Sequence, residues 1–177
     1  MAIDKIQSES INLADTFAFT GTVTGAGADN KPAFHARQSG DQNLTRATSV
    51  KLTSFSEELD TNSAFASDKF TVPSGQGGKY LIYFSASFNS GVAGGDGEDY
   101  MAEVYKNGSA LSGTRARLSD NGGFKMFLNN GSIGLSGIYT LAASDYIELY
   151  AYTMDQNASG SIQANAHTTF GAYRIIT

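Results

Sequence analysis

A segment of strict alternation between residues 79 and 88 constrains the fold more than any other part of the chain. Its apolar residues recur at every second position: Tyr80, Ile82, Phe84, Ala86 and Phe88. A period of two belongs to a β-strand and not to a helix, so we expect these residues to face a core. On the other face Leu81 and Tyr83 are also apolar before polar residues follow, which predicts that one end of the strand is covered on both sides. A neighbouring subunit is one candidate for that cover.

A proline and a cluster of glycines precede this strand. Pro73 has no backbone N–H to donate, and Gly75, Gly77 and Gly78 tolerate positive φ. We therefore expect a short strand over 69–72 to end at the proline, and the chain to turn sharply before it re-enters a sheet.

Short strands separated by turn signals fill most of the remaining chain from residue 31. Asn107-Gly108 is a strong hairpin signal, and residues 142–145 are typical of another turn. The acidic stretch around Glu57, Glu58 and Asp60 is expected to be a loop. About nine or ten short strands without a convincing amphipathic helix predict an all-β sandwich or jelly roll. Besides 69–72 and 79–88, we expect strands over 33–38, 49–55, 100–106, 110–118, 124–130, 132–141, 146–154 and 167–177.

Charge and composition exclude several classes of protein. The 177 residues suffice for one substantial core, with no more than an appendage beside it. A formal net charge of -5 and the lack of basic clusters argue against nucleic acid as a partner. Because the chain has no cysteine, packing and oligomerisation must supply the stability that disulfides give other small domains. The sequence shows neither a signal-peptide pattern nor an apolar run long enough to span a bilayer, so we expect no membrane partner.

Candidate catalytic and metal-binding residues are few. The two histidines, His35 and His167, fall in predicted strand regions without metal-ligand spacing, and we expect both to be structural. Asp96, Glu98 and Asp99 lie close together in a glycine-rich loop and carry the oxygen ligands that calcium prefers. The ordinary expectation for such a loop is solvated carboxylates, with calcium binding as the alternative. We predict no enzyme activity, no catalytic residue and no required cofactor.

Five motifs in a fixed order carry a resemblance to a known family. They are AFHAR, SAFASDKFTVPSGQGGKYLIYFSASF, AEVYKNGSAL, YTLAASDYIELYAY and TTFGAYRI. Their order resembles that of the globular head of complement component 1q and its relatives, which share a jelly roll with the tumour necrosis factor family. The resemblance covers about residues 32 to 177. It implies a ten-stranded antiparallel jelly-roll sandwich that assembles as a compact homotrimer.

The resemblance also assigns residues to the core and to the subunit interface. It implies a core that includes Phe70, Tyr80, Phe84 and Phe170. The implied trimer-interface residues are Phe34, Leu81, Tyr83, Tyr150, Tyr152 and Tyr173. Core and interface assignments could exchange, because each strand carries apolar residues on both faces.

The first 30 residues differ from the rest and are expected to form an arm and linker, with the jelly-roll head over 31–177. The alternative is an N-terminus without a role. Joined through TGAG to such a head, the arm looks like structural proteins of tailed bacteriophages. The candidate anchoring residues are its sparse apolar positions, Ile3, Ile6, Ile11, Leu13, Phe17 and Phe19.

These resemblances imply a structural protein on the surface of a phage virion, made in the host cytoplasm. It would decorate or cement the capsid, or form a head fibre, as a trimer that its arms attach to other virion proteins. The alternative is a tail-fibre tip or adhesin that binds host glycans. In that case loops 91–99 and 156–164, with Tyr100 and Tyr152, would contact the sugar.

Overall fold

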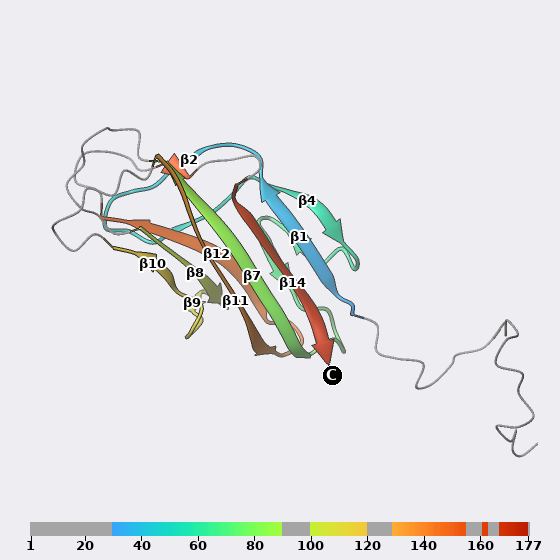
Figure 1. The fold of residues 1–177 in the computed structure, drawn as a ribbon. Helices are drawn as coiled ribbons and strands as arrows, with labels where there is room; N and C mark the ends of the chain where they lie inside the picture. The colour runs from blue at the N-terminus through green and yellow to red at the C-terminus, as the bar shows by residue number, and fades with distance from the viewer. Residues whose placement is uncertain (1–29, 90–99, 120–128, 155–160, 163–166, 177) are drawn as a thin grey trace, which may run out of the picture.

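The structure, a computed structural model, describes residues 30–89, 100–119, 129–154, 161–162 and 167–176. Every regular element in these ranges is a β-strand, and every strand pair that they form is antiparallel. The strands form two sheets that pack face to face (Figure 1). The predicted all-β antiparallel sandwich is confirmed.

One layer, which we call the β7 sheet, has β7 at its centre. Its strand order is β2–β13–β7–β14–β1–β4. β11 pairs with the edge of β7 that lies opposite β14. Its strands are β1 (Ala33–Gln38), β2 (Gln42–Asn43), β4 (Phe55–Asp60), β7 (Gly78–Asn89), β11 (Asn129–Leu141), β13 (Ser161–Ile162) and β14 (Thr169–Ile176).

The other layer, the β12 sheet, has the order β10–β8–β12–β6–β5, with β3 paired to β12 and β9 paired to β8. Asn107 and Gly108 both have positive φ, 51° and 78°, and close the predicted hairpin between β8 and β9. The strands of this sheet are β3 (Val50–Lys51), β5 (Phe65–Ala66), β6 (Lys69–Thr71), β8 (Tyr100–Lys106), β9 (Ser109–Ala110), β10 (Ala116–Leu118) and β12 (Tyr146–Thr153).

The proline–glycine segment is the sharp turn that the sequence predicts. β6 belongs to the β12 sheet and β7 to the β7 sheet, so the turn carries the chain from one layer to the other. The backbone N–H of Gln76 donates to the carbonyl of Pro73 at 3.1 Å, and Gly75 has a φ of 73°. A glycine suits this position because its φ lies in the left-handed region.

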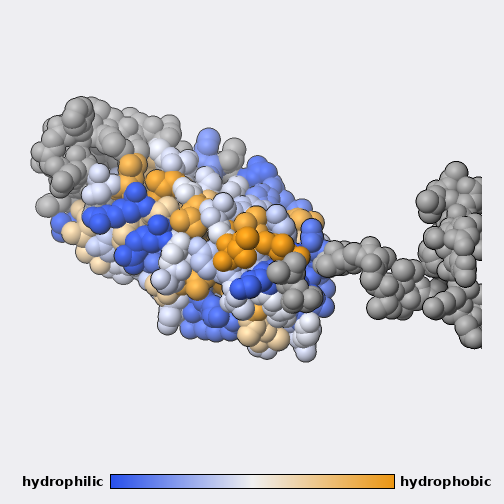
Figure 2. Space-filling model, turned by 60° about the horizontal axis from the view of Figure 1, so that its bottom comes forward, coloured by the Kyte–Doolittle hydropathy of each residue, from blue (hydrophilic) through white to orange (hydrophobic). Residues whose placement is uncertain are grey.

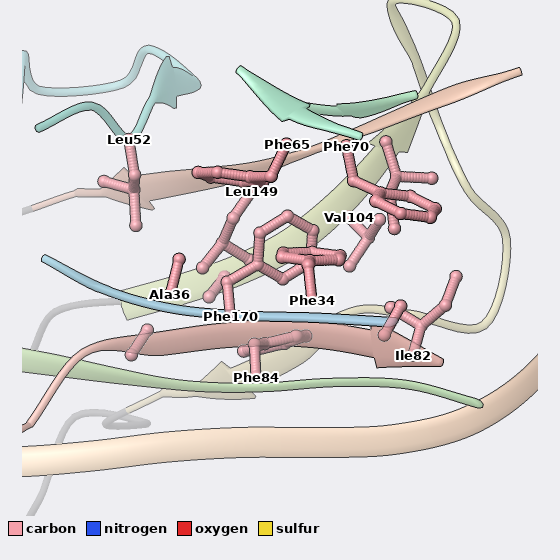
Figure 3. Close-up of a cluster of buried hydrophobic side chains, with 14 of the residues drawn as sticks. Phe34, Ala36, Leu52, Phe65, Phe70, Ile82, Phe84, Val104, Leu149 and Phe170 are labelled. Atoms are coloured by element: carbon pink, nitrogen blue, oxygen red, sulfur yellow. The ribbon is translucent and has the colours of Figure 1, made fainter. Parts of the chain in front are cut away.

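The core between the two sheets is rich in aromatic rings (Figure 3). The alternating residues of β7 are all buried, as predicted, and so are the expected core residues Phe70, Tyr80, Phe84 and Phe170. Phe34 on β1 stacks on Phe65 at 4.9 Å and on Phe70 at 4.8 Å. Phe170 meets Phe34 edge-on at 5.1 Å. Such pairs add about 0.5–1.5 kcal/mol each beyond the area they bury.

The predicted place of Phe34 in a subunit interface is therefore wrong. Its side chain is 1% exposed and lies at the centre of the core. The reason is the alternation of β1, in which Phe34, Ala36 and Gln38 point inward while the residues between them face outward.

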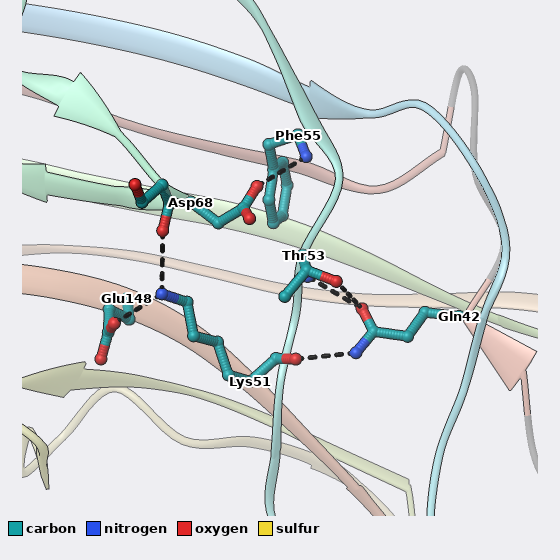
Figure 4. Close-up of polar contacts among 7 residues, drawn as sticks. Gln42, Lys51, Thr53, Phe55, Asp68 and Glu148 are labelled. Carbon is teal, nitrogen blue, oxygen red and sulfur yellow. Dashed lines mark hydrogen bonds and ion pairs between the residues drawn. The ribbon is translucent and has the colours of Figure 1, made fainter.

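A polar network crosses the segment predicted as one strand over 49–55 (Figure 4). The Gln42 side chain donates to the Lys51 carbonyl at 2.8 Å and accepts the Thr53 N–H at 2.8 Å. The ammonium of Lys51 pairs with Glu148 at 2.7 Å. Because the Thr53 N–H bonds to a side chain and Ser54 has a φ of 63°, the ladder breaks. The single predicted strand is therefore replaced by β3 and, from residue 55, β4.

The acidic stretch predicted as a loop is strand β4, so that prediction is wrong. Among the described strands β4 pairs with β1 alone, as an edge strand. An edge strand tolerates charged side chains, because they remain solvated there and oppose pairing of the edge with another chain. Asp60 ends the strand and accepts the N–H groups of Ala64 and Phe65 at 3.0 and 2.9 Å.

Phe34→Ala should lower the free energy of unfolding by about 3–5 kcal/mol, because it empties the centre of the aromatic cluster. Ser112→Ala is the control, since Ser112 is exposed between β9 and β10, in the opposite sheet. We expect it to change the stability by less than about 0.5 kcal/mol. Urea unfolding followed by circular dichroism measures both values, and equal losses would contradict the packing described.

Candidate functional site

The described residues show no arrangement typical of a metal centre. Within them, no three His, Asp or Glu side chains lie where they could hold a metal ion together. Glu103 pairs with Arg115 at 3.0 Å and Glu148 with Lys51 at 2.7 Å, so both carboxylates have basic partners. None of the described segments forms a helix suited to crossing a membrane.

Several predicted site residues lie outside the described residues. They are the calcium candidates Asp96, Glu98 and Asp99 and the anchoring candidates Ile3, Ile6, Ile11, Leu13, Phe17 and Phe19.

The outward face of the β7 sheet is the best candidate for a functional surface. Register places Tyr173, Leu81 and Ile138 side by side across β14, β7 and β11. The next row across the sheet contains Leu59, His35, Gly171 and Tyr83. We call the surface formed by Leu59, Leu81, Tyr83, Ile138 and Tyr173 the Leu81 face.

The Leu81 face exposes more apolar side-chain area than is expected of a sheet face that contacts only water. Ile138 is 61% exposed and Leu59 is 49% exposed, while Leu81, Tyr83 and Tyr173 are half-buried. In the space-filling view, hydrophobic residues form one larger patch and several smaller ones on a mixed surface (Figure 2). Contiguous exposed apolar patches on a folded chain mark interaction surfaces.

A glycine lets Tyr83 reach across β14 to β1. Gly171 lies between Tyr83 and His35 in the row, and a Cβ at this position would overlap the Tyr83 ring and come within 2.9 Å of the Phe34 carbonyl. The Tyr83 ring therefore covers the glycine and stacks on the His35 ring, with centroids 5.8 Å apart. The Tyr83 hydroxyl lies 3.0 Å from His35 Nδ1.

The other side of His35 meets charged groups. Its Nε2 lies 3.3 Å from a carboxylate oxygen of Glu58, whose other oxygen pairs with Arg37. Burial, with the positive charge of Arg37, lowers the pKa of His35 below its ordinary 6.5. Burial, with the nearby Tyr173, raises the pKa of the Tyr83 hydroxyl. The apolar face thus contains one polar cluster, formed by Arg37, His35, Glu58 and Tyr83.

Two other predicted interface residues lie elsewhere. Tyr150 and Tyr152 are half-buried on β12, in the opposite sheet, so one chain does not bring them to the Leu81 face. Tyr150 stacks on Tyr105 with centroids 3.9 Å apart. Tyr100, a predicted glycan contact, is 4% exposed and packs on Phe88 at 5.0 Å, so it is not placed to stack on a sugar and that prediction is wrong.

Gly171→Ala should displace the Tyr83 ring and separate it from His35. We expect a loss of about 1–3 kcal/mol in unfolding free energy, as for other overpacked sites. Gly40→Ala is the matched control, because a Cβ there meets nothing within 4 Å. Denaturant unfolding gives the stabilities and the His35 ring signals in NMR report the contact; an unchanged His35 environment in Gly171→Ala would contradict this geometry.

Comparison with known proteins identifies the fold. No family model and no curated protein sequence matches the chain. The crystal structure of murine APRIL at pH 8.5 is similar at 14% identity, over 81% of this chain and 98% of that one, with a TM-score of 0.55. The globular domain of zebrafish complement 1qA protein is similar at 15% identity, over 82% and 98% of the two chains, with a TM-score of 0.55.

A third similar structure is Eiger TNF from S. frugiperda, at 11% identity over 81% of this chain and 92% of that one, with a TM-score of 0.56. Identities this low show the fold alone. The chain is an all-β jelly roll of the type found in tumour necrosis factor-like and complement 1q-like domains.

Proposed function

We propose that this protein is a non-enzymatic structural component of a bacteriophage virion that acts as a homotrimer, decorating or cementing the capsid or forming a head fibre. The Leu81 face carries the assembly part of this proposal. Apolar side chains lie together there on the outward face of the sheet, and Ile138 and Leu59 are 61% and 49% exposed in the single chain. Burying such area is worth about 25 cal/mol per Å².

A second copy of the chain is the proposed occupant of this face. Among the described strands β11 pairs with β7 alone, so it forms an edge of the sheet next to the apolar patch. Its outward positions beside Ile138 are occupied by the small residues Ser132, Gly134 and Ser136, which allow close approach of another surface. A patch that meets an edge of the next copy makes a head-to-tail contact, and such contacts close into a ring of three when the rotation fits. The sequence resemblance to complement 1q-like heads implies the same number of copies.

The virion setting is supported by the sequence. The arm before the head resembles arms of tailed-phage structural proteins, and the chain has no cysteine, as suits a protein that matures in a reducing cytoplasm. Three arms on one trimer would bind the particle with an avidity well above that of a single arm.

Ile138→Asp should convert the trimer into a folded monomer, because it places a charge within the proposed apolar contact. Ile138 is exposed in the single chain, so the fold itself should persist. Ala110→Asp adds the same charge at an exposed position of the β12 sheet and should leave the trimer intact. Sedimentation velocity gives the masses. A monomeric wild-type chain, or a trimeric Ile138→Asp, would contradict the proposed assembly.

Removal of residues 1–24 tests the anchoring role. We expect a folded trimer that no longer joins the particle, measured by the protein content of purified virions and by particle stability. Incorporation of the truncated trimer would show that the arm is not the anchor. Binding of the purified trimer to host cells, with unchanged stability of particles that lack it, would favour the adhesin instead.

A further inference from the structure

We propose that association through the Leu81 face is acid-sensitive, with His35 as the group whose protonation separates the copies. This inference rests on the homotrimer proposed above. It adds a regulatory element to the same surface, because His35 lies in the row of side chains that contains Leu59 and Tyr83.

Both nitrogens of the His35 ring are engaged in the single chain. Nδ1 lies 3.0 Å from the Tyr83 hydroxyl and Nε2 lies 3.3 Å from Glu58. A carboxylate only accepts hydrogen bonds, so Nε2 must carry the proton, and Nδ1 then accepts the proton of the Tyr83 hydroxyl. In this neutral form every polar group of the contact has a partner, so the cluster can be covered at little cost.

Protonation of His35 disturbs this arrangement. Nδ1 then becomes a donor, so the Tyr83 oxygen must accept, and the hydroxyl proton of Tyr83 must turn to another acceptor. Water takes that role when the face is open. When a second copy covers the face, the hydroxyl proton loses this acceptor, and a hydrogen-bonding group left without a partner is costly to bury.

The surrounding charges do not neutralise the positive charge that protonation adds to His35. Glu58 from β4 faces His35, but the same carboxylate already pairs with Arg37, which lies on β1 two residues from the histidine. β7 contributes Tyr83, whose raised pKa keeps its hydroxyl uncharged near neutral pH, and β14 contributes Tyr173 beside it. The net result of protonation is a positive charge beside an apolar contact.

The sign of the pH effect follows from these contacts. Burial and Arg37 already hold the pKa of His35 below 6.5 in the single chain. A second copy that covers the face removes more water from His35 and should lower the pKa of His35 further. The assembly therefore binds fewer protons than the separate chains. Association is therefore fully present above the pKa of His35 in the separate chain, which is lower than 6.5, and weakens as the pH falls through that pKa.

Sedimentation velocity of the full chain between pH 8 and pH 5 tests this inference. Below the lowered pKa that His35 has in the separate chain, each His35 should weaken association by up to about tenfold per pH unit. His35→Gln, which keeps an N–H donor but does not titrate, should remove most of this dependence. His167→Gln is the matched control, since His167 is exposed away from the Leu81 face, and it should behave like the wild type.

Glu58→Gln is a second variant that keeps His35 in place. Loss of the carboxylate leaves His35 beside an uncompensated Arg37, so dissociation should shift to lower pH. A wild-type chain that is monomeric at pH 8 would contradict the proposed homotrimer itself. A trimer whose association does not change between pH 8 and pH 5, or one in which His35→Gln weakens as the wild type does, would overturn the acid-sensitive step alone.

Discussion

Strand β7 hydrogen-bonds along both of its edges, to β14 on one side and to β11 on the other, and the rest of the β7 sheet is built outward from these two ladders. Strict alternation along β7 divides its side chains between two environments. Tyr80, Ile82 and Phe84 enter the core, whereas Leu81 and Tyr83 lie on the outward face. One strand therefore fixes both the packing of the sandwich and the apolar surface through which we propose that copies associate.

The position of β7 in the sheet also accounts for glycine at two positions of the chain. Gly75 permits the turn that carries the chain between the sheets and into β7. Gly171, on the strand beside β7, leaves the space into which the Tyr83 ring folds to reach His35. Close backbone approach at the second glycine thus joins three neighbouring strands through one polar contact on an otherwise apolar surface, and that contact makes the surface responsive to protons.

Much of the fold could be predicted because alternation is a local property. The core face of β7 and the hairpin at Asn107 are visible in the sequence. The interface assignment of Phe34 is wrong although its polar neighbours His35 and Arg37 mark the other side of the strand as outward. Ile138 is absent from the predicted interface, although its neighbour Tyr139 packs against the core and alternation then places Ile138 on the outward face. β4 escaped prediction because an edge strand tolerates charges. The meeting of His35 with Tyr83 depends on the strand order β1–β14–β7, which local sequence does not encode.

The central claim is that copies of this chain cover the Leu81 face. The absence of cysteine allows a single thiol to be introduced as Ile138→Cys, with Ala110→Cys on the other sheet as the reference. The rate of maleimide labelling at neutral pH, measured across a range of protein concentrations, reports whether each position is covered. We predict that the thiol at 138 becomes slow to react as the concentration rises, while the thiol at 110 keeps one rate. Equal and concentration-independent rates at both positions would contradict the account.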